Sequence, residues 1–315
     1  MKTKQCRNLF ITHAVLLLMG AVHGIAETKD AQAAGVLFQQ FEIVFRAKAN
    51  LLSRSGRHDF RRVPFSLLLN GLSALGKQVP AQILDNSEAV LVGTKDYIMP
   101  KGLGMVRSTV CYVIVLRDHS GLDFGRHFDR PVSSAAGSPV WNWSADLQEF
   151  GEGDARASSL YMSEIEQSYI LLSNDLEELT YVAVRLRGSG EVASAVLGGL
   201  REWGDVSRHE FWGYRRYRHS RVLDKFAAGM RSVTANMEAL TLSADSGKGT
   251  GILRLLSSAP DDTTAENAAK MMPLFNPQGP GVWQAVVPLE NEGKDQTNMK
   301  GLFEITWLFG FGLVL

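Results

Sequence analysis

The sequence has very little cysteine, and this excludes a disulfide framework. Of 315 residues only Cys6 and Cys111 are cysteine. Cys6 precedes the apolar run at the N-terminus, so it cannot be the lipidated cysteine of a bacterial lipoprotein. Removal of the leader described below would leave Cys111 alone, which excludes an intramolecular disulfide and a dithiol redox centre. Cys111 lies in the strand-like apolar run 109–116, so we expect a small buried core residue.

The chain also lacks an excess of charge of either sign. It has 33 basic and 33 acidic residues, and the predicted leader holds three bases and no acids. The remaining chain would therefore carry three more acids than bases. This balance excludes bulk attraction to nucleic acid or to an anionic membrane surface. The apolar content of 45% is typical of a globular protein rather than a disordered one.

Specific catalytic motifs are absent as well. The chain has no Gly-x-Ser-x-Gly nucleophile elbow and no Ser-x-x-Lys, and His209-Glu210 lacks the second histidine of a zinc-protease helix. The glycine-rich residues 246–251 do not have the spacing of a phosphate-binding loop and are typical of a hairpin turn. Active sites assemble in space rather than in sequence, so these absences favour a non-catalytic protein and leave an enzyme open.

Long apolar runs are missing after residue 26, so no transmembrane helix is predicted there. Residues 1–26 have the layout of a secretory signal peptide. Three basic residues precede the apolar run 9–19, and small residues lead to a cleavage site at 24–26. The apolar stretch is short for a membrane span, which favours cleavage over an uncleaved N-terminal anchor. We therefore expect an exported protein, either periplasmic or secreted.

What the chain does contain is a set of similar segments in its two halves. Residues 87–92 (SEAVLV) resemble residues 237–242 (MEALTL), and Trp141 and Trp283 each follow a Gly/Pro turn at the start of a strand-like run. Nearly constant offsets in the same order predict an internal duplication. Paired tryptophans on such strands usually lie in the core, and the alternative is that they line a pocket for a sugar or an apolar ligand.

These segments predict an α+β fold of two related helix-plus-antiparallel-sheet modules, because successive strands with short connections pair antiparallel. Apolar residues at helical spacing predict a helix over 34–52 before the modules and one at the start of each module, over 63–78 and 222–237. A further short helix is predicted over 263–272. The predicted divisions are a signal peptide (1–26), an N-terminal helical lead-in (27–62), module 1 (63–187), a connector (188–221) and module 2 (222–315).

Residues 168–179 (SYILLSNDLEEL) predict a strand that leads into a capped helix, with Asn174 as the N-cap and Glu177 three residues later. This segment resembles one found in uncharacterised exported bacterial proteins that have no assigned chemistry. The resemblance covers these residues only. It implies an exported bacterial protein of unknown function and no particular active site.

The densest cluster of titratable residues follows the strand-like run 109–116. It consists of Asp118, His119, Asp123, His127 and Asp129. The spacing His127-x-Asp129 places both groups on one side of an extended segment, and such groups bind zinc or a similar divalent ion. The alternative is a solvated loop whose acids pair with neighbouring arginines. Apart from this divalent metal, no cofactor is predicted.

Arginines alternate with aromatic residues at the end of the connector. The candidate strip consists of Arg208, Trp212, Tyr214, Arg215, Arg216, Tyr217 and Arg218. Such a strip can bind an anionic small molecule or glycan, or an unknown protein. The alternative is packing between the modules, and nucleic acid is not expected for an exported protein.

Together these patterns favour an exported, envelope-associated binding or interaction protein without catalytic activity. One alternative is a metal-dependent hydrolase that uses the Asp/His cluster 118–129. Another is a structural component of an envelope complex, with the apolar residues 307–315 at an interface. The sequence names neither the ligand nor the partner.

Overall fold

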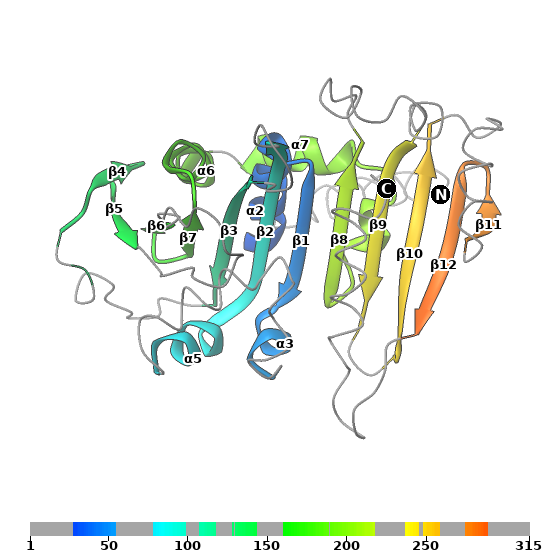
Figure 1. Cartoon of the computed structure of the whole chain (residues 1–315), viewed down its shortest axis with the longest axis horizontal. Coiled ribbons are helices and arrows are strands. Elements are labelled where there is room, and N and C mark those ends of the chain that lie inside the picture. Colours follow the sequence, from blue (N-terminus) through cyan, green and yellow to red (C-terminus); the bar gives the residue numbers. More distant parts are fainter. Residues whose placement is uncertain are drawn as a thin grey trace, which may run out of the picture.

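A single antiparallel sheet is the centre of the computed structural model, which describes residues 28–54, 78–98, 107–117, 128, 130–143, 160–188, 190–217, 237–245, 248–258 and 275–288 (Figure 1). Within these ranges the strands are β1 (Ile43–Lys48), β2 (Ser87–Ile98), β3 (Arg107–Leu116), β4 (Ser133–Ala135), β5 (Ser138–Trp143), β6 (Leu160–Ile165), β7 (Tyr169–Ser173), β8 (Phe211–Arg216), β9 (Met237–Ala244), β10 (Thr250–Ser257), β11 (Asn276–Gly279) and β12 (Val282–Pro288). Their order across the sheet is β11-β12-β10-β9-β8-β1-β2-β3-β7-β6-β5-β4.

The described helices divide between the two faces of the sheet. They are α2 (Lys29–Gln40), α3 (Ala49–Arg54), α5 (Gln78–Asp85), α6 (Leu176–Gly188), α7 (Gly190–Gly198) and α8 (Trp203–Val206). Apolar residues of α2, α6, α7 and α8 share one buried cluster with one face, which we call the α2 face. Residues of α3 and α5 belong to the cluster on the opposite face. Among the described helices, none has the length and apolar character needed to cross a membrane.

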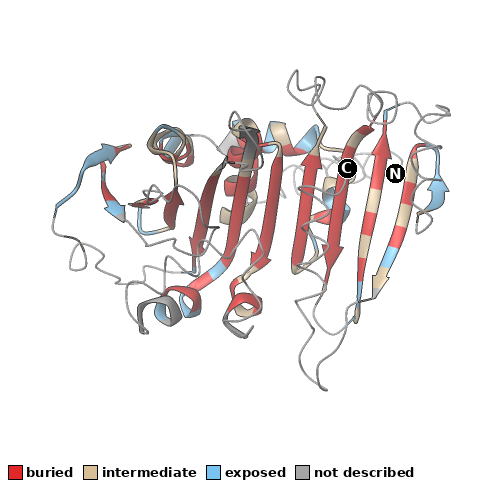
Figure 2. Ribbon diagram, viewed as in Figure 1, coloured by how far each residue is buried: buried red, intermediate tan, exposed pale blue. Residues whose placement is uncertain are grey.

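Strand β1 shows how the sequence supplies both cores. Successive side chains of a strand point to opposite faces, so apolar residues at every position serve a strand covered on both sides. Val44 belongs to the core of the α2 face, whereas Ile43 and Phe45 belong to the opposite core. Figure 2 shows the central strands almost entirely buried, while β11 at the edge is exposed along its whole length.

The predicted fold of two related helix-plus-antiparallel-sheet modules is wrong, because the described strands form one continuous antiparallel sheet. Strand β1 lies in the predicted lead-in and β8 in the predicted connector. They pair with each other, Ile43–Ala47 against Phe211–Arg215, and each also pairs with the first sheet strand of a predicted module, β2 or β9. The two segments expected to precede and link the modules are therefore the middle of the sheet.

The helix predicted over 34–52 is also wrong, and this explains why β1 was assigned to a helical lead-in instead of to the sheet. The apolar residues there fit a helical period, but α2 ends at Gln40 and β1 begins at Ile43. Phe41 has extended backbone angles at the C-cap. Because β1 is paired on both sides, inter-strand hydrogen bonding decided its conformation against the local pattern.

Other local predictions are confirmed. The helix expected after residue 174 is α6, but its first amide groups are capped by Asp175, whose Oδ1 accepts hydrogen bonds from Glu177 and Glu178. Asn174 instead accepts a hydrogen bond from the amide of Val110 on β3. Trp141 and Trp283 are both buried core residues on the face opposite α2. Burial raises the pKa of the Cys111 thiol, as expected for an inert core residue.

The predicted helices at 63–78, 222–237 and 263–272 lie almost entirely outside the described residues, which reach only Gln78 and Met237. They stay predictions.

Candidate functional site

A polar pocket of about 380 Å³ opens on the α2 face, between α8 and the strands β9 and β10. Its lining residues are Asp205, Val206, Arg208, His209, Thr241, Ser243, Asp245, Lys248 and Arg254. Thr241 and Ser243 lie two residues apart on β9 and therefore share one face of the sheet. Arg254 lies opposite Thr241 on β10, so the sheet supplies the floor of the pocket. The segment from α8 to the start of β8 supplies one wall, and Asp245 and Lys248, which lie just after β9 and just before β10, line one end.

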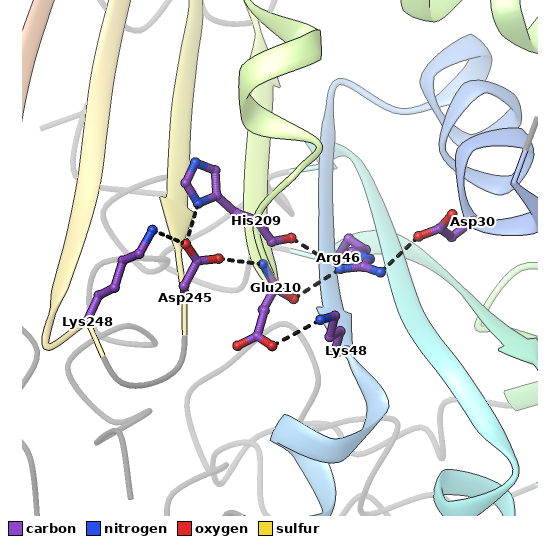
Figure 3. Close-up of polar contacts among 7 residues, drawn as sticks. All are labelled: Asp30, Arg46, Lys48, His209, Glu210, Asp245 and Lys248. Atoms are coloured by element: carbon purple, nitrogen blue, oxygen red, sulfur yellow. Dashed lines mark hydrogen bonds and ion pairs between the residues drawn. The ribbon is translucent and has the colours of Figure 1, made fainter. Parts of the chain in front are cut away.

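Asp245, immediately after β9, organises this end of the pocket (Figure 3). Its Oδ2 accepts a hydrogen bond from Lys248 Nζ at 2.7 Å and lies 3.0 Å from His209 Nδ1. Its Oδ1 accepts a hydrogen bond from the amide of Glu210 at 3.0 Å. One carboxylate thus joins the end of β9, the β9–β10 turn and the start of β8.

These donors determine the charge of Asp245. Partial burial alone would raise its pKa, but hydrogen bonds from Lys248, the Glu210 amide and His209 outweigh burial and lower the pKa to about 2. Asp245 is therefore an anion at neutral pH, and its negative charge is already neutralised by groups of the protein.

Arg46 on β1 holds the segment carrying His209 from the other side. Its Nη1 donates hydrogen bonds to the carbonyl oxygens of His209 and Glu210, both at 3.2 Å, and its Nη2 pairs with Asp30 of α2 at 2.9 Å. The Arg46 residue is only 6% exposed. Beside it, Lys48 Nζ pairs with Glu210 Oε1 at 3.0 Å. The wall of the pocket is thereby fixed to both β1 and α2 (Figure 3).

The lining is slightly positive. Among the lining residues, the cations Arg208, Lys248 and Arg254 outnumber the carboxylates of Asp205 and Asp245 by one, and Glu202 outside the lining pairs with Arg254 at 3.1 Å. The Arg208 side chain is 79% exposed and lies 3.8 Å from Asp205, a long ion pair that leaves the guanidinium accessible. Guanidinium, ammonium and hydroxyl donors around one pocket suit the oxygen atoms of an anion.

The His209–Asp245 pair also has the arrangement of a general base with its orienting carboxylate. Catalysis of acyl transfer would need a nucleophile hydrogen-bonded to the histidine. In the described part of the chain, no serine or threonine hydroxyl makes a hydrogen bond to His209.

The predicted metal-binding residues Asp118, His119, Asp123, His127 and Asp129 all lie outside the described residues. Elsewhere, the described ranges contain no group of three or more histidine, cysteine, aspartate or glutamate side chains arranged to hold a metal ion. The metal-dependent hydrolase thus stays a prediction.

The predicted arginine–aromatic strip is distributed over both faces of β8. Trp212 and Tyr214 are buried on the α2 face, where the ring of Phe38 of α2 contacts both, at ring-centroid distances of 6.4 and 5.5 Å. Arg216 on the same face lies 5.4 Å above the Phe38 ring and donates hydrogen bonds to the carbonyl oxygens of Phe38 and Phe41. These residues attach α2 to the sheet.

The remaining strip residues lie elsewhere. Arg215 is buried on the opposite face, with its guanidinium 4.9 Å from the Tyr217 ring, and burial raises the pKa of Tyr217. Arg218 lies outside the described residues. Arg208 is the strip residue that lines the pocket. The six described residues therefore do not form one exposed surface, and an anionic partner for the strip as a whole stays a prediction.

Sequence reasoning missed most of the pocket. His209 was interpreted only as part of an incomplete zinc motif and Lys248 only as part of a hairpin turn, and Asp245 was not singled out. A usable signal was present in residues 237–245 (MEALTLSAD), where Thr241, Ser243 and Asp245 place polar groups on one face of an otherwise apolar strand.

No protein family and no curated protein matches the chain. Among solved structures, crystal form I of TP0453 is 10% identical with a TM-score of 0.38, over 87% of this chain and 95% of that one. Crystal form III of TP0453 is 10% identical with a TM-score of 0.34, over 81% and 93%. Similarity at this level supports no conclusion about function.

Proposed function

We propose that the protein is an exported, envelope-associated binding protein, without catalytic activity, that holds a small anion in the pocket on the α2 face. The observation that carries the proposal is the convergence of Arg208, Lys248 and Arg254 with the hydroxyl-bearing Thr241 and Ser243 on one open pocket. Export is supported by the signal-peptide pattern of residues 1–26.

The donors of the pocket are only partly used within the protein. Lys248 Nζ has three N–H donors, and one of them donates a hydrogen bond to Asp245. Arg254 uses Nε for Gln284 at 3.0 Å and Nη1 for Glu202 at 3.1 Å, and a guanidinium has five N–H donors. Together with the exposed guanidinium of Arg208, these groups can surround an oxyanion.

The carboxylates of the pocket do not oppose this binding strongly. Asp245 pairs with Lys248, so that these two residues together add no net charge while Lys248 keeps further N–H donors, and Asp205 is largely exposed to water, which screens its charge. The volume of about 380 Å³ lies near the lower end of the range of about 300–1,000 Å³ for small-molecule pockets. A phosphate, phosphate ester or carboxylate therefore fits better than a large glycan.

Titration calorimetry of the purified protein with inorganic phosphate and with acetate tests the proposal. Arg208→Gln and Lys248→Gln should each weaken phosphate binding about tenfold or more, because each removes a charge-assisted hydrogen bond. Arg187→Gln is the matched control, since Arg187 is an exposed arginine of α6 that pairs with Glu166 outside the pocket. Absence of binding at millimolar anion, or equal weakening by the control, would refute the proposal.

A further inference from the structure

The pocket continues on its β10 side into apolar side chains. Ser243 on the pocket floor lies directly opposite Ile252 of β10, and Ile252 lies directly opposite Val286 of β12. These three residues belong to one row on the α2 face, because directly paired residues of antiparallel strands point to the same side of the sheet. Two strand spacings take the row about 10 Å from the pocket towards the sheet edge.

This row is open to solvent where other apolar residues of the α2 face are buried. Val286 is 58% exposed and Ile252 is half-buried. In Figure 1 the labelled helices lie near β1–β3, β7 and β8, and none lies over β10 or β12. We call Ile252 and Val286 the apolar shelf. A single exposed valine is ordinary on a protein surface, but this one continues a row that starts in a charged pocket.

A polar pair borders the shelf. The next row on the same face holds Arg254 and Gln284, which are hydrogen-bonded at 3.0 Å. A wholly polar anion would leave the shelf in water, and a wholly apolar ligand would cover the cations of the pocket without pairing them. A ligand with both characters satisfies both surfaces.

We infer that the ligand is a single-chain amphiphilic anion, with its charged group among Arg208, Lys248 and Arg254 and a short apolar chain across Ile252 and Val286. This inference rests on the proposed anion binding and specifies the class of ligand. The charge of the pocket selects the head group, and the length of the shelf limits the chain to a few carbon atoms.

A homologous series of monoesters tests the inference: methyl, propyl and hexyl phosphate, titrated into the full protein. Complete burial of one methylene raises affinity about fourfold, and an open shelf that buries half of it raises affinity about twofold. Hexyl phosphate should therefore bind on the order of 30-fold more tightly than methyl phosphate. The propyl chain should gain from Ile252 and the hexyl chain also from Val286.

Substitutions separate the shelf from the pocket. Val286→Asn should remove most of the gain from propyl to hexyl phosphate and leave methyl phosphate unchanged. Val184→Asn, at a valine of α6 that is 53% exposed, is the matched control and should change no affinity. Arg208→Gln should weaken all three esters by the same factor.

The outcomes distinguish the inference from the proposal beneath it. Equal affinity for the three esters would refute binding of the ligand chain by the apolar shelf and would leave the proposed anion binding intact. Failure of all three esters to bind would overturn the proposed function itself. Binding to vesicles containing phosphatidylglycerol that depends on Val286, together with no gain along the ester series, would overturn the single-chain ligand in favour of a bilayer lipid.

Discussion

The α2 face of the sheet differs between its two sides. Over β1–β3, the residues Val44, Leu91 and Val113 are fully buried beneath Phe38 of α2 and its neighbours. Over β9 and β10 the corresponding surface carries Thr241 and Arg254 and opens into the pocket. The same sheet thus has a helix-covered side and an open side, and polar chemistry gathers where the described helices stop.

The boundary between the two sides is itself charged. Arg46 belongs to the covered side, but its hydrogen bonds reach the carbonyl oxygens of His209 and Glu210 on the open side. The buried guanidinium is compensated there by two carbonyl groups and the Asp30 carboxylate, which accept hydrogen bonds from Nη1 and Nη2, whereas its buried Nε has no hydrogen-bond partner among the described residues. The site therefore depends on how firmly the covered side holds this boundary.

The largest expected effect comes from breaking the boundary with Arg46→Ala. The change removes the Arg46 cation from the partly buried Asp30 carboxylate and one hydrogen bond from each of two backbone carbonyls, so the free energy of unfolding should fall by about 3–5 kcal/mol. Urea denaturation followed by circular dichroism measures it. Lys48→Met, which removes the neighbouring but largely solvated pair with Glu210, should cost less than about 1 kcal/mol. Similar losses for the two variants would contradict this account.

The covered side should resist added volume. In Gly35→Ala on α2, the new Cβ would lie 2.6 Å from Ala193 Cβ and 2.7 Å from its backbone on α7. Backbone cannot move aside easily, so we expect the free energy of unfolding to fall by about 2 kcal/mol, despite the better helix propensity of alanine. Gly198→Ala in the same α7 meets nothing within 4 Å and should be neutral or stabilising. Thermal melting of both variants provides the check.

The open side should show its own dependence on pH through Asp245. A carboxylate whose pKa is lower in the folded state stabilises the fold above its unfolded pKa, and that stability is lost as pH falls from about 5 towards 2. Allowing for solvent screening, Asp245→Asn should cost about 1 kcal/mol at pH 7 and flatten this part of the stability profile. Urea midpoints at pH 7 and pH 3 test it. If the variant loses as much stability between pH 7 and pH 3 as the unsubstituted protein, other carboxylates control the loss of stability in acid.

The smallest effect is expected at the shelf. Val286→Ser creates no cavity because the side chain already faces solvent, so the free energy of unfolding should change by less than about 0.5 kcal/mol. Leu91→Ala, on the same face beneath α2, should cost about 2–5 kcal/mol. Paired denaturation curves measure the contrast. A large loss at Val286 would mean that the open side is packed after all.

Prediction from sequence succeeded where local pattern governs. Runs of apolar residues predict strands β2 and β9 and the burial of Cys111. Apolar residues at helical spacing, together with a capping signal next to them in the sequence, predict the helix α6. Prediction failed at β1, where apolar residues at helical spacing lie in a strand. At β8, Trp212, Tyr214 and Arg216 of the candidate strip pack α2 against the sheet, in line with the packing alternative rather than with one exposed surface.

Residue types at short range were enough to predict strands β2 and β9, the helix α6 with its capping region and the burial of Cys111. The tertiary structure decided that β1 and β8 join all the described strands into one sheet. It also decided that His209, Asp245, Lys248 and Arg254 meet in one pocket. The physical reason is that pairing of β8, β9 and β10 brings strand ends from distant parts of the chain together, and register across strands leaves no period in the sequence.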